Sequence, residues 1–199
     1  MLPFHERSIL LLEMEQPPFL SGRLLLAMPG MSDPRFDHAV IAIAVHDENG
    51  AVGIGIGHKR AGIRFRALLK QLGLDPGEAP DRAVLHGGPV EPGRGFVLHS
   101  TDWGGNGTVE VAPLCALSFS VDVLRAIAEG RGPSRWLFAL GYAGWGEHQL
   151  EDEMREHGWH AAAAHPEILF DTPVADRWQA AWKAEGIDTA LLASETGHA

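Results

Sequence analysis

Residues 38–57 read HAVIAIAVHDENGAVGIGIG, and this stretch decides the fold class. Two runs of β-forming residues, 38–45 and 51–57, flank the dipeptide Asn49-Gly50. Asn-Gly between two such runs is the strongest short-range signal for a β-hairpin. We therefore predict an antiparallel strand pair here, which favours an α+β fold over a doubly wound parallel sheet.

The second run of this hairpin carries Gly53, Gly55 and Gly57 at alternate positions. Alternation in a strand places all three on one face. A dinucleotide-binding loop would need its glycines between a strand and the start of a helix. Because these glycines lie inside a predicted strand, we expect them to pack closely against neighbouring backbone instead.

Further elements are predicted on both sides of the hairpin. Short apolar runs predict strands at 23–28, 84–86, 95–99, 108–111, 117–119 and 135–140, while periodicity and caps predict helices at 65–72, 121–129, 147–156 and 172–183. We expect a single domain over residues 1–199, with a lead-in segment at 1–17 and a tail at 187–199. Its sheet should be mixed but mainly antiparallel, with several helices packed on it.

The charge balance is acidic, with 26 Asp and Glu against 16 Lys and Arg and a formal charge of −10. Such a surface repels phosphate backbones and disfavours direct nucleic-acid binding. A basic stretch that contains Lys59, Arg60, Arg64 and Arg66 is the best candidate for a local DNA-contacting patch. The alternative is an ordinary solvated face.

Cys115 is the single cysteine, so no internal disulfide can form, which suits a reducing compartment. Its apolar neighbours predict a buried, inert thiol rather than a redox sensor. No apolar run approaches the roughly 18 residues of a membrane span. The first residues carry Glu6, Glu13 and Glu15 instead of a basic-then-apolar signal pattern. We expect a cytoplasmic protein without membrane contact.

Residues 136–154, WLFALGYAGWGEHQLEDEM, predict a strand–turn–helix corner at Gly141–Gly144. A nucleophile elbow would need a serine where Ala143 stands, so hydrolysis by that route is excluded at this position. The corner would still offer backbone N–H groups to an anion or a carbonyl. Tight packing of strand on helix is the alternative.

His86 and His99 end short predicted strands on either side of the turn at 87–93. Each has the chemistry of a general base, so an enzyme of unknown type, with or without a metal, is the rival interpretation. A zinc site needs three or four convergent ligands, and the sequence shows no such spacing. We expect no metal and no cofactor.

Several segments, in order, resemble the YqgE/AlgH family of bacterial proteins. They are Met28-Pro29-Gly30, Asp33-Pro34-Arg35-Phe36, residues 46–51, Gly87-Gly88-Pro89-Val90, residues 94–100, residues 141–146, Gln149-Leu150-Glu151, Trp159 and residues 170–173. The resemblance covers about residues 18 to 185. It implies one compact cytosolic α+β domain with sandwich and barrel features, and no settled biochemical activity.

Some members of that family are described as transcriptional regulators of exopolysaccharide production, so the resemblance also implies a role in transcription, direct or indirect. The sequence shows no recognised DNA-binding motif. It departs from the family pattern at His58, His148 and His157, where Asn, Gly and Asn are usual. These changes bear on any site that needs the usual asparagines.

We therefore predict a non-enzymatic binding or regulatory protein, either monomeric or weakly self-associating. Its ligand or partner surface should combine the two glycine-rich segments and comprise Gly87, Gly88, Pro89, Arg94, His99, Gly141, Gly144, Trp145 and Gln149. Arg94 would bind a carboxylate or phosphate, and Gln149 an amide or carbonyl. The sequence does not distinguish a protein partner from a small molecule.

Overall fold

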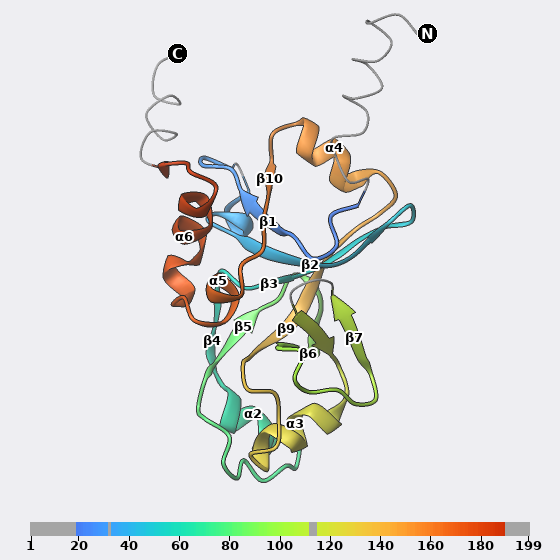
Figure 1. The fold of residues 1–199 in the computed structure, drawn as a ribbon, viewed down its shortest axis with the longest axis vertical. Coiled ribbons are helices and arrows are strands. Elements are labelled where there is room, and N and C mark those ends of the chain that lie inside the picture. Colours follow the sequence, from blue (N-terminus) through green and yellow to red (C-terminus); the bar gives the residue numbers. More distant parts are fainter. Residues whose placement is uncertain (1–18, 32, 112–114, 190–199) are drawn as a thin grey trace, which may run out of the picture.

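A computed structural model describes residues 19–31, 33–111 and 115–189 (Figure 1). The elements in chain order are β1 (Leu24–Ala27), η1 (Pro34–Phe36), β2 (Val40–Asp47), β3 (Gly50–Gly55), β4 (Lys59–Arg64), α2 (Phe65–Gln71), β5 (Ala83–His86), β6 (Val90–His99), β7 (Thr108–Val111), β8 (Cys115–Ser118), α3 (Val121–Ala128), β9 (Trp136–Trp145), α4 (Gln149–Arg155), β10 (Trp159–Ala162), α5 (Pro166–Phe170), η2 (Val174–Asp176) and α6 (Arg177–Ala184). The predicted α+β class is confirmed. The lead-in at 1–17 and most of the tail lie outside the described residues.

Strand β9 holds together the two halves of a curled, mainly antiparallel sheet. The strand order is β10-β1-β2-β3-β9-β6-β8-β7, with β5 and β4 branching beside β9. Residues 136–140 and Tyr142 of β9 pair with β6, whereas residues 143–145 pair with β3. Gly141 lies close to this change of partner and has φ +77°, a backbone conformation that favours glycine. It therefore bends one continuous strand from the half of the sheet with β4 to β8 into the half with β1 to β3 and β10. These are called the lower half and the upper half, as they lie in Figure 1.

The β2–β3 hairpin forms as predicted, with Asp47 opposite Gly50 at its turn. The alternating glycines of β3 also pack as expected. A Cβ atom on Gly53 would overlap the side chain of Ile41, and one on Gly55 would lie 2.5 Å from the carbonyl oxygen of His86. Close approach of neighbouring chain explains this spacing without a cofactor.

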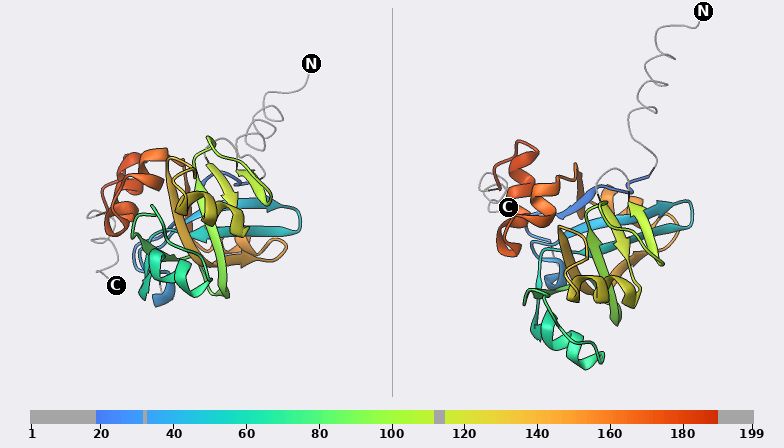
Figure 2. Two further views of the ribbon diagram at one scale, coloured as in Figure 1. Left: turned by 90° about the horizontal axis from the view of Figure 1, so that it is seen from below. Right: turned by 60° about the horizontal axis from the view of Figure 1, so that its bottom comes forward.

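The sheet buries apolar side chains on both faces, because alternate residues of each strand point in opposite directions. Inside the curl, Leu24 and Leu26 face Leu98, and Trp178 and Trp182 of α6 complete this core. Helices α2 and α3 cover the outer face of the lower half, whereas α4 packs on the upper half (Figures 1 and 2). Helices thus cover apolar side chains on both faces of the sheet, α6 on the inner face and α2, α3 and α4 on the outer face.

The predicted corner at Gly141–Gly144 is wrong. Strand β9 continues to Trp145, and α4 begins at Gln149 after a turn in which His148 has φ 60°. The physical reason is that Gly141, with φ +77°, bends the strand without ending it. Strands β4 and β10 and helix α5 have no counterpart among the predicted elements, and β6 begins at Val90 instead of residue 95.

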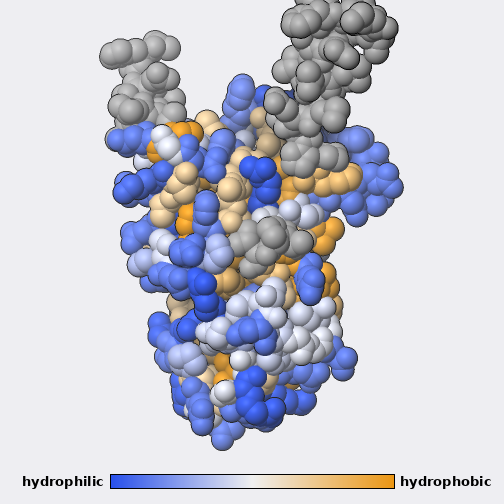
Figure 3. Space-filling model, viewed as in Figure 1, coloured by the Kyte–Doolittle hydropathy of each residue, from blue (hydrophilic) through white to orange (hydrophobic). Residues whose placement is uncertain are grey.

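Polar side chains cover most of the face seen in Figure 3, with apolar residues scattered between them. In the described part of the chain, no helix combines the length and the apolar character that crossing a bilayer requires.

Candidate functional site

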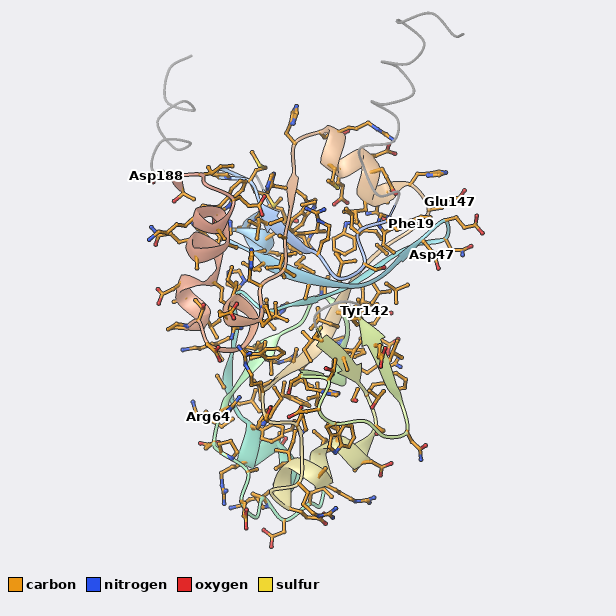
Figure 4. The ribbon with its side chains drawn as sticks, in the orientation of Figure 1. Phe19, Asp47, Arg64, Tyr142, Glu147 and Asp188 are labelled. Carbon is orange, nitrogen blue, oxygen red and sulfur yellow. The ribbon has the colours of Figure 1, made fainter. Side chains whose placement is uncertain are left out.

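The two glycine-rich segments meet at the bend of β9. The N–H of Gly87 donates to the carbonyl of Leu140 at 2.9 Å, and the N–H of Gly55 donates to the carbonyl of Gly87 at 2.7 Å. A Cβ atom on Gly87 would overlap the carbonyl oxygen of Gly141, and one on Gly141 would overlap that of Gly88. Backbone therefore packs on backbone here, beside Tyr142, which lies midway along the molecule (Figure 4).

A hollow of about 260 Å³ opens beside this contact. Its apolar walls come from η1, β2, β9 and the turn before β6, and comprise Phe36, Ala39, Val40, Ile41, Pro89 and Ala143. Its ionisable side chains are Arg35, His58, Lys59 and His86, with no carboxylate among the described residues that line it. An apolar floor under a cationic rim suits a ligand with an anionic group and an apolar body.

The segment Asp33-Pro34-Arg35-Phe36 forms one wall of this hollow. The carboxylate of Asp33 accepts from the backbone N–H of Arg35 at 3.0 Å and caps η1. It also accepts from Nε of Arg35 at 3.0 Å and from Nη2 at 2.6 Å. The Arg35 guanidinium holds the pKa of Asp33 below its usual value. The pair fixes the direction of an otherwise exposed guanidinium.

A second hollow of about 440 Å³ adjoins the first. The two share Arg35, Phe36, Pro89 and Ala143. The lining particular to the second is Met31, Asp33, Gly144, Trp145, Gln149, Glu153, Glu156, Gly158 and Trp159. Together the two hollows are called the groove below.

Glu153 is the best-anchored polar side chain of the groove. Its Oε2 accepts from the indole N–H groups of Trp145 and Trp159, each at 2.9 Å, and its Oε1 accepts from Nε2 of Gln149 at 2.9 Å. Oε1 of Gln149 in turn accepts from the N–H of Gly146 at 3.0 Å. Gln149 thus lies in the groove, but its amide also positions Glu153.

Of the nine surface residues predicted from sequence, the structure brings seven to the groove or its floor: Gly87, Gly88, Pro89, Gly141, Gly144, Trp145 and Gln149. Arg94 lies elsewhere, paired with Glu91 at 3.2 Å and placed over the rings of Phe96 and Phe119. It lines neither hollow.

His99 is fully buried and also lies outside the groove. One ring nitrogen donates to the carbonyl of Ser100 at 2.8 Å, and the other lies 2.9 Å from the hydroxyl of Ser118. Burial lowers the pKa of His99, which favours the neutral ring. These bonds account for His99 as a structural residue.

His86 is exposed at the end of β5 and lines the first hollow. It pairs with Leu140 of β9, whereas His99 pairs with Trp136 on the other side of that strand. The structure therefore does not bring the two histidines of the enzyme alternative together. Among the described residues, no group of three or more His, Cys, Asp or Glu is placed to hold a metal ion.

The basic stretch after His58 is spread over β4 and α2. Arg60 donates to the carbonyl of Pro92, Arg64 pairs with Asp81 and Arg66 donates to the carbonyl of Ala79. Arg64 marks this edge of the lower half in Figure 4. Lys59 differs from these arginines because it lines the first hollow.

The groove also contains residues that the sequence did not indicate as part of the predicted surface, among them Arg35, Phe36, His58, Lys59, Glu153 and Glu156. The signal for the first two was present in the Asp33–Phe36 motif, which carried the family resemblance but was given no role. Lys59 belongs to the predicted basic stretch and His58 to the departures from the family pattern, and nothing in their spacing indicates that β4 begins beside β5. Glu153 and Glu156 lie in the helix predicted at 147–156, where their spacing indicates no site.

Comparison with known proteins agrees with this fold. A family model described as AlgH-like matches residues 24–190. A UPF0301 protein of Novosphingobium aromaticivorans is 67% identical over 186 residues, covering 94% of this chain and 100% of that protein. A UPF0301 protein of Rhizorhabdus wittichii is 56% identical over 186 residues, which also cover 94% of this chain and 100% of that protein.

Two solved structures have a similar fold. The solution structure of the AlgH protein from Pseudomonas aeruginosa superposes with a TM-score of 0.76 at 40% identity, covering 94% of this chain and 99% of that one. A crystal structure of a protein from Corynebacterium diphtheriae has a TM-score of 0.71 at 21% identity, covering 92% and 96%. The second similarity concerns the fold alone.

Proposed function

This chain belongs to the AlgH-like family, and we propose that it is a non-catalytic binding protein whose groove takes a molecule with an anionic group. The observation that carries the proposal is the charge of the first hollow. The chain as a whole carries −10 with its histidines neutral, yet the charged side chains that line this hollow are Arg35 and Lys59, and His58 and His86 add ring nitrogens. Cations gathered over an apolar floor attract an anionic ligand.

Contacts within the protein hold the side chains and backbone of the site in place. Asp33 holds the guanidinium of Arg35, and the glycine contact between residues 87–88 and 141 fixes the floor. A preformed site loses little conformational entropy when it binds, which favours affinity. The apolar wall at Phe36 and Pro89 would take the uncharged part of the ligand.

Regulation would follow from occupancy of the groove, so any effect on transcription would be indirect. The arginines of the basic stretch already bond to acceptors within the protein, which supports a role other than contact with DNA. We place this role in the cytoplasm, since the single thiol suits a reducing compartment.

Titration calorimetry with phenyl phosphate tests the proposal, since that compound joins a phosphate to an apolar ring. The Lys59→Gln variant should bind about five- to tenfold more weakly than the natural protein, because it loses one charge-assisted contact. Lys70→Gln is the matched control, as Lys70 is exposed on α2 and lines neither hollow. Equal affinity of both variants, or no binding to the natural protein, would contradict the proposal.

A further inference from the structure

We infer that the natural ligand of the groove is an extended peptide segment with an acidic and a basic side chain on either side of an apolar residue. This inference rests on the proposed function and adds the class of ligand. Its basis is the opposite charge of the two adjoining hollows.

The first hollow supplies a cation at one end of the groove, Lys59, which is exposed at the start of β4 next to the exposed ring of His58. Arg35 lies between the hollows and is neutralised by Asp33. The net negative charge of the second hollow therefore comes from Glu153 and Glu156. A ligand that spans both hollows needs an anion at one end and a cation at the other.

The centre of the groove is apolar. Phe36, Pro89 and Ala143 line both hollows, so the part of the ligand between the two charges meets carbon rather than polar groups. This order of charge, apolar surface and opposite charge matches three successive parts of a peptide. A ligand that carries only one sign of charge would not complement both ends of the groove.

The acidic end is fixed in place. Two indole N–H groups and one amide hold the carboxylate of Glu153, as described above, and Glu156 is exposed beside it at the end of α4. Bare backbone borders this end, because Gly144 and Gly158 both line the second hollow. Glycine lets the main chain of a peptide approach closely, which suits recognition through backbone groups.

A display library of random peptides of roughly ten residues tests the inference with the full-length protein as bait. The natural protein should enrich peptides with one acidic and one basic residue separated by an apolar residue. Lys59→Glu should shift enrichment to peptides with two basic residues, and Glu156→Lys to peptides with two acidic residues. Such reversals cannot result from unfolding, which removes binding but creates no new preference.

The most enriched peptide, synthesised alone, should lose about fivefold in affinity in either variant, and its charge-matched counterpart should gain. Lys70→Glu is the control and should leave the preference unchanged. Enrichment without a charge pair, no enrichment at all, or a preference insensitive to both variants would overturn the inference. If phenyl phosphate still bound in a Lys59-dependent way, the proposed function would survive that result.

Discussion

The carbonyl oxygen of Gly141 occupies the space that a side chain on Gly87 would need. Gly87 follows β5, and Gly141 is the bend of β9, so residues 54 positions apart are in backbone contact. The same bend carries β9 from one half of the sheet to the other. The groove therefore lies where β9 passes from one half of the sheet to the other.

Replacement of Gly87 by alanine should destabilise the protein by roughly 1–3 kcal/mol, because the added methyl group overlaps backbone that cannot move independently. Denaturant unfolding measures this change. Gly93→Ala is the matched control, since a Cβ atom there meets nothing within 4 Å. Equal stability of the two variants would mean that the two segments are less tightly packed than described.

Glu153→Gln should also destabilise the protein, by about 1–3 kcal/mol, because the amide oxygen can still accept from both indole N–H groups but the new NH2 group faces Nε2 of Gln149, which loses its acceptor. The emission of Trp145 and Trp159 should change in the same variant. Glu156→Gln, at an exposed position on the same helix end, should leave the unfolding free energy within about 0.5 kcal/mol of its natural value. An unchanged midpoint in Glu153→Gln would show that the carboxylate charge and its contact with Gln149 contribute little to stability.

The buried ring of His99 should make stability depend on pH. Burial lowers the pKa of His99 below its ordinary value of 6.5, so the unfolded chain binds the proton more readily. The contribution is complete above pH 6.5 and is lost as the pH falls toward the lowered pKa of the folded protein. Unfolding free energies across this range should therefore decline more steeply for the natural protein than for His99→Gln. Parallel pH profiles would contradict the assignment.

The thiol of Cys115 should be unreactive in the folded protein. Burial raises its pKa to about 12, so almost no thiolate exists at about pH 8. Iodoacetamide should modify the native protein far more slowly than the guanidinium-unfolded protein, as followed by mass spectrometry. Similar rates in both states would place the thiol at the surface.

Much of the fold follows from local sequence signals. Asn49-Gly50 predicts the hairpin, and the caps at Ser120 and Gly130 bound α3 closely. What the sequence did not reveal are strands whose character depends on their neighbours. Strand β4 is a charged segment, and β10 is short and alanine-rich, so neither has the composition of a typical strand. Each is a strand because it pairs with a neighbour, β4 with β5 and β10 with β1.

The candidate site was partly predictable for a similar reason. Glycine-rich segments indicate close approach of backbone, and two of them do meet. Which side chains surround the contact is set by packing of distant elements. Arg94 points toward Glu91 and Phe119, whereas Arg35 reaches the groove through a capped turn at Asp33. Residue type and spacing alone could not separate these two arginines.

A crystal structure of the protein grown with phenyl phosphate tests the central claim most directly. The account predicts the phosphate within hydrogen-bonding distance of Lys59 or Arg35, the ring against Phe36, and Gly87 in contact with Gly141 beneath it. A ligand bound elsewhere on the molecule, or a structure in which Gly87 and Gly141 lie apart, would contradict it.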